Sequence, residues 1–434
     1  MNTNINTNNF SISKNYKINK YILYGLLAAF VLITSVKAAL SGGDFHVFLD
    51  AALKLKNGQN IYAAPFIKGL HYFYSVFFAF VLIPFSEHVF WAEVLWSILS
   101  YWFLYRTYVL VKGYFDFEYL NQTKKNIWTL SLIFLSIQSM IYNFSMIQVT
   151  FFLLWAIFES LHLITKQKQF IGGGLLGLVI NIKIMPVLIL PYLFYRGYFK
   201  AVFASLLAVV ALLFLPSLFI GFEYNSFLLG EWWKEINPSN KEHLFEDGIG
   251  THSLVALIPV YLTETVGEMN FSRNFLNLSH ATVEVVINIS RLFLLLISLF
   301  YLRFSIFKKE YCKLNVFWEF SYFVAIIPLI MPHQQKYAFA FILPLISYLV
   351  YFFLVSYEFE KNIKYKMSFS IFVLCMLFFS PIYGSDVLGK FLFRLTQHYR
   401  LLTISTLLII PLSIYLSPNK LNSILKRNVT KSKL

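Results

Sequence analysis

Long apolar segments separated by short polar connections make up most of this chain. A membrane-spanning helix needs about 20 mainly apolar residues, and helices inside a bundle can be shorter. About thirteen segments meet this pattern, which predicts an all-α, polytopic integral membrane protein with 12–13 transmembrane helices. They lie near 21–40, 71–85, 88–111, 127–142, 145–165, 170–182, 184–195, 200–221, 283–307, 316–331, 337–355, 368–381 and 401–417.

Two connections, 41–70 and 222–282, are much longer than the others. We therefore expect a single transmembrane domain over 21–417 with two long outer loops. A polar, Asn-rich tail precedes it at 1–20, and a basic tail follows it at 418–434. The first apolar run lacks a small-residue cleavage site, so we expect a retained first helix.

The first long loop contains its own periodic pattern. Apolar residues at positions 45, 48, 49, 52, 53 and 55 recur at roughly helical spacing. This spacing predicts a short amphipathic helix that lies at the membrane interface.

Composition supports the membrane class. Apolar residues form 58% of the chain and charged residues 13%, whereas a soluble domain has about 45–50% and about 25%. This difference excludes a soluble globular enzyme, a disordered chain and a fibrous repeat. The two cysteines, Cys312 and Cys375, form neither a disulfide framework nor a metal-ligand spacing. With no Asp-x-Asp or His-carboxylate cluster evident, we expect no metal and no cofactor.

Charge predicts the orientation. The net charge is +15, and most basic residues lie in short loops between apolar runs. We read this as membrane orientation and contact with anionic lipid, not nucleic-acid binding, and place the basic loops in the cytoplasm. Segments 41–70, 143–148, 222–282 and 332–336 and residue 183 then share the outer face. The spans between 71 and 126 alternate wrongly in this scheme, so a re-entrant or mis-assigned segment must lie there.

Charged groups beside spans cost about 2.5–3.5 kcal/mol on insertion scales and need a reason. Asp44 opens the first long loop after Gly42-Gly43. It is either the N-cap of the predicted short helix or a catalytic carboxylate. Lys183 has mostly apolar residues on both sides. It either extends its ammonium group to the interface or faces a buried anion.

Three further polar sites lie between spans. His333 and Lys336 stand in the run Pro332-His-Gln-Gln-Lys-Tyr337, which is either an ordinary polar turn or a cradle for an anion. Asn143 and Gln148 flank a short turn between two apolar runs. His252, near the end of the second long loop, belongs to a plain loop or lines a sugar or acceptor site.

The order of these features resembles the GT-C class of membrane glycosyltransferases, and most closely glycosyltransferase family 87. The resemblance covers roughly residues 20–350. The matching elements are Gly43-Asp44-Phe45, Gly58 and Tyr62, Asn143 with Gln148, the glycine-rich segment that runs to Lys183 and Pro186, and Pro332-His333. The chain departs from the family where Tyr74-Ser75-Val76 replaces a Tyr-x-Pro-Pro-Leu motif, where Ile147 precedes Gln148, and at Thr251-His252-Ser253.

This resemblance implies transfer of one sugar, a hexose such as mannose, from a polyprenyl-phosphate donor to a lipid or glycan acceptor with inversion. It implies that Asp44 is the general base. Lys183, His333 and Lys336 would hold the donor phosphate, and Asn143, Gln148 and His252 would bind the sugar or acceptor. Lysine outnumbers arginine and Asn and Ile are frequent, which suggests an AT-rich genome and a bacterial plasma membrane. The placement of the basic loops in the cytoplasm predicts that the site faces outward.

Two other functions fit a multi-span chain. A transporter or flippase of lipid-linked saccharides usually carries paired internal repeats with broken helices, and we find no convincing repeat. A polysaccharide polymerase or ligase that takes pyrophosphate-linked donors would favour several arginines in its outer loops, but Arg273 is the only one in 222–282.

Overall fold

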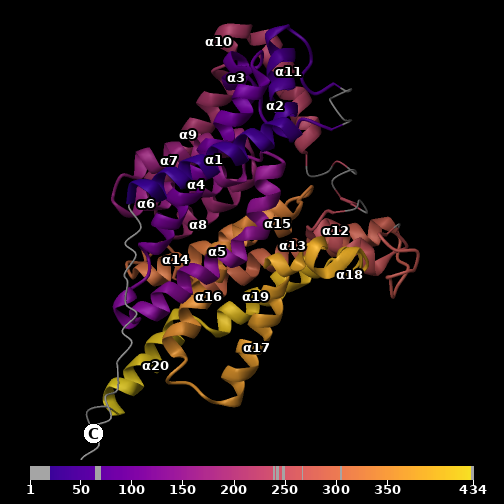
Figure 1. Ribbon diagram of the computed structural model, residues 1–434. Coiled ribbons are helices and arrows are strands. Elements are labelled where there is room, and N and C mark those ends of the chain that lie inside the picture. Colours follow the sequence, from indigo (N-terminus) through magenta and orange to yellow (C-terminus); the bar gives the residue numbers. More distant parts are fainter. Residues whose placement is uncertain are drawn as a thin grey trace, which may run out of the picture.

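The computed structural model describes residues 20–63, 70–237, 240, 244–246, 250–265, 267–303 and 305–431, and every regular element in these ranges is a helix. The helices form an elongated bundle (Figure 1). Its first half contains α1 (Lys20–Ser41), α2 (Phe45–Lys56), α3 (Val76–Leu82), α4 (Val89–Lys112), α5 (Gln122–Ser145), α6 (Thr150–Thr165), α7 (Gln169–Ile182), α8 (Ile189–Tyr195), α9 (Phe199–Phe214), α10 (Ser217–Ile220) and α11 (Phe222–Ile236).

The second half begins in the second long loop. It contains α12 (Leu254–Leu262), α13 (His280–Leu302), α14 (Lys313–Ala325), α15 (Ile327–Ile330), α16 (Leu343–Ser356), α17 (Ile363–Leu377), α18 (Ser385–His398), α19 (Leu401–Tyr415) and α20 (Pro418–Lys431). Short 3-10 helices at Ile83–Phe85, Phe117–Tyr119, Met185–Leu188, Lys336–Ile342 and Pro381–Tyr383 extend or connect these helices.

The all-α membrane class is confirmed, and each predicted apolar segment coincides with a helix. Seven helices of the described residues are long and apolar enough to span a membrane, or eight if the pair α18–α19, bent by 64°, is one span. Four more apolar helices are shorter, at Val76–Phe85, Thr150–Thr165, Gln169–Ile182 and Met185–Tyr195. The number of full-length helices is therefore smaller than the expected 12–13.

The short helix at Val76–Phe85 explains the inconsistent alternation expected between 71 and 126. Ten residues extend about 15 Å as a helix, half the thickness of the hydrocarbon core. This segment packs against α2, α7 and α11, and we do not count it as a separate span. Once it is not counted as a span, the loops before and after it alternate correctly.

The centre of the bundle is formed by α14 and α16. About 89% of each of these spans is buried, against 17% of the spans that contain α1 and α9, which therefore lie on the lipid-facing periphery. Close backbone packing attaches α7 to α9. A Cβ atom added to Gly173 would lie 2.3 Å from the Ala201 oxygen, and one on Gly177 would lie 2.4 Å from the Ser205 oxygen. Small residues four apart allow this approach.

The structure gives different results for the two predicted tails and for the short helix of the first long loop. The tail at 1–20 lies outside the described residues except for Lys20. The basic tail after 417 forms α20, which buries Leu421 and Ile424 against the bundle that includes α14 and α16. The amphipathic helix of the first long loop is confirmed as α2, but it packs under α3 with seven buried residues and is not a purely interfacial helix.

Candidate active site

The loop that begins α2 and the turn between α5 and α6 touch through their backbones. The Asp44 amide donates to the Met146 oxygen at 2.9 Å. A Cβ atom on Gly43 would lie 2.5 Å from the Met146 carbonyl, so only glycine allows this approach. Ile147 turns the chain with φ 48°. Two motifs about 100 residues apart in sequence are thereby joined.

Asp44 occupies the N-cap position of α2, but its side chain forms no capping hydrogen bond. Its carboxylate instead accepts a hydrogen bond from the Gln148 side-chain amide, and Gln148 is buried. The Gln148 carbonyl oxygen has no hydrogen-bond partner among the described residues. Helix capping alone therefore does not account for this carboxylate.

Lys183 follows α7, where the chain becomes extended. Its Nζ atom lies 3.3 Å from the Tyr74 hydroxyl and 5.0 Å from the centre of that ring. Within the described ranges it forms no ion pair. Burial lowers the pKa of Lys183 to about 8, and the negative charge of Asp44 opposes this shift. The pair Asp44 and Lys183 therefore belongs to one electrostatic site.

Tyr74 joins Lys183 to the aromatic residues below α2. Burial raises the pKa of Tyr74 well above its ordinary value, so its hydroxyl remains protonated. Its ring lies 4.4 Å from that of Phe48 and 5.5 Å from that of Phe78. Ser75, the N-cap of α3, donates to Asn181 near the end of α7 at 3.1 Å. These contacts fix the position of Lys183 relative to the first long loop.

His333 reaches the same region from the turn after α15. Its backbone is left-handed, with φ 56°. The ring stacks on Phe73 at 5.0 Å with an interplanar angle of 15°, and Nδ1 lies 2.6 Å from a carboxylate oxygen of Glu246. Glu246 is buried and also accepts a hydrogen bond from the His333 amide. Phe73 directly precedes Tyr74, whose hydroxyl contacts Lys183, so the segment 73–74 connects His333 to the surroundings of Lys183.

Asn143 fixes the turn from α5. It is buried, and its side-chain amide donates to the Ser139 oxygen at 2.8 Å and to the Tyr337 oxygen at 3.1 Å. Its backbone oxygen accepts from the Gln148 amide. Asn143 thus connects the Gln148 turn to the segment after His333. We call Asp44, Asn143, Gln148, Lys183 and Tyr74 the Asp44 cluster.

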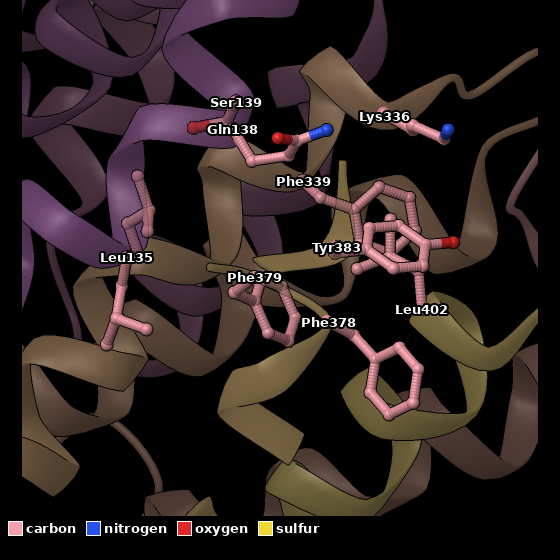
Figure 2. A pocket seen from close by; sticks show the side chains of 10 residues that line it. Leu135, Gln138, Ser139, Lys336, Phe339, Phe378, Phe379, Tyr383 and Leu402 are labelled. Atoms are coloured by element: carbon pink, nitrogen blue, oxygen red, sulfur yellow. The ribbon is translucent and has the colours of Figure 1, made fainter. Parts of the chain in front are cut away.

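Lys336 lies apart from this cluster. Its Nζ atom is 3.2 Å from the Tyr142 hydroxyl and 3.9 Å from the centre of the Phe393 ring. Figure 2 shows Lys336 at the edge of a narrow pocket that is filled largely by aromatic side chains, among them Phe339, Phe378 and Tyr383. The surroundings of Lys336 are therefore mainly aromatic.

His252 is fully buried beside Lys336. Its amide donates to the Gln334 oxygen at 2.7 Å, and Nε2 lies 3.0 Å from the Gln397 side-chain oxygen. Burial lowers the pKa of His252 well below its ordinary value, and the charges of Arg400 and Lys336 add to this effect. The neutral ring therefore donates from Nε2. Its Nδ1 has no hydrogen-bond partner in the described part of the chain.

The structure thus brings Asp44, Asn143, Gln148 and Lys183 together and places His333 at their edge. Lys336 and His252 lie together in a second group beside Arg400. Sequence reasoning missed Tyr74, Glu246 and Arg400 as members of these groups. Tyr74 could have been found, because it occupies the first position of the motif from which this chain departs.

A metal site has no obvious ligands here. Among the described residues, no group of three or more His, Cys, Asp and Glu side chains could hold a metal ion.

Comparison with protein families provides independent information. The model of glycosyltransferase family 87 matches residues 72–303, which is more than half of the chain and includes Asn143, Gln148, Lys183 and His252. Asp44, His333 and Lys336 lie outside the matched range. No curated protein and no solved structure matches the chain significantly. With its apolar helical bundle, the chain belongs to glycosyltransferase family 87 and is a membrane glycosyltransferase.

Proposed function

We propose that the protein transfers a single sugar from a polyprenyl-phosphate donor to a hydroxyl group of a lipid or glycan acceptor, with inversion at the anomeric carbon. The observation that carries this proposal is the half-buried cation of Lys183 beside the Asp44 carboxylate in a chain of this family. Lys183 forms no ion pair with any residue that the structure describes. A hexose such as mannose is the sugar we expect.

Asp44 is the general base in this proposal. The acceptor hydroxyl loses its proton to the carboxylate as its oxygen attacks the anomeric carbon, and the bond to the donor phosphate breaks through an oxocarbenium-like state. The hydrogen bond from Gln148 orients the Asp44 carboxylate in this proposal. The Gln148 carbonyl oxygen, which has no hydrogen-bond partner among the described residues, is then suited to accept from a sugar or acceptor hydroxyl.

The leaving phosphate gains negative charge in the transition state, so cations placed in advance stabilise that state most. Lys183 is the main cation, and the Tyr74 hydroxyl holds its ammonium group in place. His333, fixed by Glu246 and Phe73, adds a second donor. Lys336 is a more distant member of the phosphate site, since it faces Tyr142 and Phe393.

Asn143 and His252 support the sugar or acceptor site from behind. Both are buried, and both use their donors on protein groups. Their role in our proposal is to hold the Gln148 turn and the segment at 333–337 in position.

The lipid tail of the donor requires contact with the bilayer, which the apolar periphery of the bundle provides. We place the enzyme in a bacterial plasma membrane with the Asp44 cluster on the outer face, because the basic loops lie at the other end of the helices.

The test is a transfer assay in membranes with polyprenyl-phosphate mannose as donor. Asp44→Asn should lower turnover by about 10²–10⁴-fold, the usual contribution of a general base, while the protein still folds and binds donor. Asp50→Asn, on the same helix and paired with Lys54 at 3.4 Å, is the matched control. Near-normal turnover of Asp44→Asn at equal expression would remove this residue from the role.

A further inference from the structure

A cavity of about 380 Å³ lies far from the Asp44 cluster. It is bounded by the end of α4, the turn between α6 and α7, the start of α9 and the start of α14. Four of its lining residues are basic, namely Arg106, Lys166, Lys309 and Lys313, and one, Glu310, is acidic.

The course of two helical segments shows that this cavity and the Asp44 cluster lie at opposite ends of the bundle. α6 begins two residues after Gln148 and ends at the cavity, and the α14–α15 segment begins at the cavity and ends three residues before His333. These segments extend about 24 Å and about 27 Å. The cavity and the candidate active site are therefore separated by most of the thickness of a bilayer.

Three of the four basic residues that line the cavity form no ion pair with the described residues. Arg106 forms a bidentate ion pair with Glu159, at 2.8 and 2.9 Å. By contrast, Lys166, Lys309 and Lys313 form no ion pair within the part of the chain that the structure describes. Lys309 lies 5.4 Å from the centre of the Tyr198 ring.

Glu310, the one acidic residue that lines the cavity, already accepts hydrogen bonds from the backbone. One oxygen of Glu310 accepts hydrogen bonds from the Tyr311 and Cys312 amides at 3.0 Å, and so forms the approach to α14. Three lysines from two separate segments thus line one cavity, and Glu310 is the one acidic residue among its lining residues. Lysines gathered at one cavity give it a positive potential, which attracts an anion.

We propose that this cavity binds the phosphate group of an anionic phospholipid from the leaflet opposite the active site. Lysine ammonium groups are well suited to phosphate as point charges. The cavity has the volume of a small-molecule site. Tyr114, Tyr198 and Tyr311 line it, as expected where a site borders the membrane interface. Basic pockets between transmembrane helices are suited to phospholipid head groups.

The experiment uses the full-length protein in nanodiscs of phosphatidylcholine with or without phosphatidylglycerol, and the readout is the thermal unfolding midpoint. The cavity variant is Lys166→Gln/Lys309→Gln/Lys313→Gln. The matched control, Lys361→Gln/Lys364→Gln/Lys366→Gln, removes three exposed lysines from another connection. A third arm adds inorganic phosphate to the phosphatidylcholine discs.

We expect phosphatidylglycerol to raise the midpoint of the wild type and of the control, and the cavity variant to lose most of this shift. Inorganic phosphate should then give a smaller shift. An equal or larger shift with inorganic phosphate, again lost in the cavity variant, would assign the site to free phosphate instead of lipid. Equal shifts in the cavity variant and the control would overturn the proposal. If the triple variant does not fold, the single variants Lys166→Gln and Lys313→Gln replace it. The shift of their unfolding midpoints with phosphatidylglycerol is then compared with that of the control.

Discussion

At the scale of single residues, the candidate active site depends on how burial shifts the pKa of Lys183. Lys183 has no carboxylate within hydrogen-bond distance, and a tyrosine hydroxyl is its side-chain partner in the described residues. Burial disfavours its charged form, whereas Asp44 favours it. An incoming phosphate would restore the missing negative charge. The same balance makes Lys183 sensitive to pH in a range where most lysines are not.

This sensitivity gives a prediction. The pKa of Lys183 is lowered to about 8, so the ammonium form is present below that pH and is lost as the pH rises through it. If the ammonium group holds the leaving phosphate, kcat/KM for the donor should fall above about pH 8. Lys183→Arg, whose guanidinium stays charged, should extend activity to higher pH, measured as a full pH profile of both proteins.

Two further variants test whether Lys183 is the group that titrates. Lys183→Ala should lower activity below about pH 8 and abolish the fall above that pH. His333→Ala should weaken donor use but keep that fall, because it leaves Lys183 in place. If kcat/KM falls at the same alkaline pH in the wild type and in Lys183→Arg, the titrating group is not Lys183.

At the scale of elements, the position of Lys183 depends on the packing of α7 against α9. Gly173 and Gly177 lie against the backbone of α9, and the Ser205 hydroxyl donates to the Gly173 oxygen at 2.8 Å. A Cβ atom on Gly177 would also lie 2.7 Å from that of Ala208. Neither neighbour can move without a shift of α9, because the contacts involve its backbone or a side chain fixed to it.

Gly177→Ala should therefore destabilise the protein, by about 1–3 kcal/mol if it behaves as ordinary overpacking. Gly174→Ala is the matched control, since its Cβ atom would meet nothing within 4 Å and alanine favours the helix. Thermal unfolding of both variants in detergent measures the difference. Equal midpoints would show that α7 and α9 can separate without cost.

The elements also show what could be predicted from sequence. Apolar periodicity located the helices, because burial and lipid contact impose it directly. Periodicity did not predict that α3 is too short to cross, since an apolar run looks the same whether its helix spans or packs beneath α2. Asp44 and Gln148 could be selected as unusual polar residues, but their hydrogen bond depends on the contact of Gly43 with Met146. Arg400 was missed because its position between two helices looks like an ordinary loop.

At the scale of the whole molecule, the two ends of the bundle differ in chemistry. One end gathers the Asp44 cluster and the other gathers the lysine-rich cavity. Cys312, which is exposed beside Lys313, marks the cavity end, and Cys375 is buried. The orientation can therefore be tested with a cysteine of the natural sequence.

We expect a membrane-impermeant maleimide to label Cys312 in inverted membrane vesicles but not in intact cells. Cys312→Ser should abolish the labelling. In that background, Asn57→Cys, an exposed position at the end of α2, should be labelled in intact cells. The opposite pattern at both positions would reverse the orientation and place the Asp44 cluster on the cytoplasmic side.

The short helices beside the active site have a consequence for the surrounding membrane. α6 and α7 extend only about 24 and 21 Å, less than the roughly 30 Å hydrocarbon thickness of a typical membrane. The bilayer relieves this hydrophobic mismatch by thinning around α6 and α7, or head groups and water move inward to the helix ends. In our proposal the Asp44 carboxylate, which accepts a hydrogen bond from Gln148 two residues before α6, then meets its lipid-linked substrate below the general plane of the head groups. Turnover should accordingly depend on the acyl-chain length of the host bilayer.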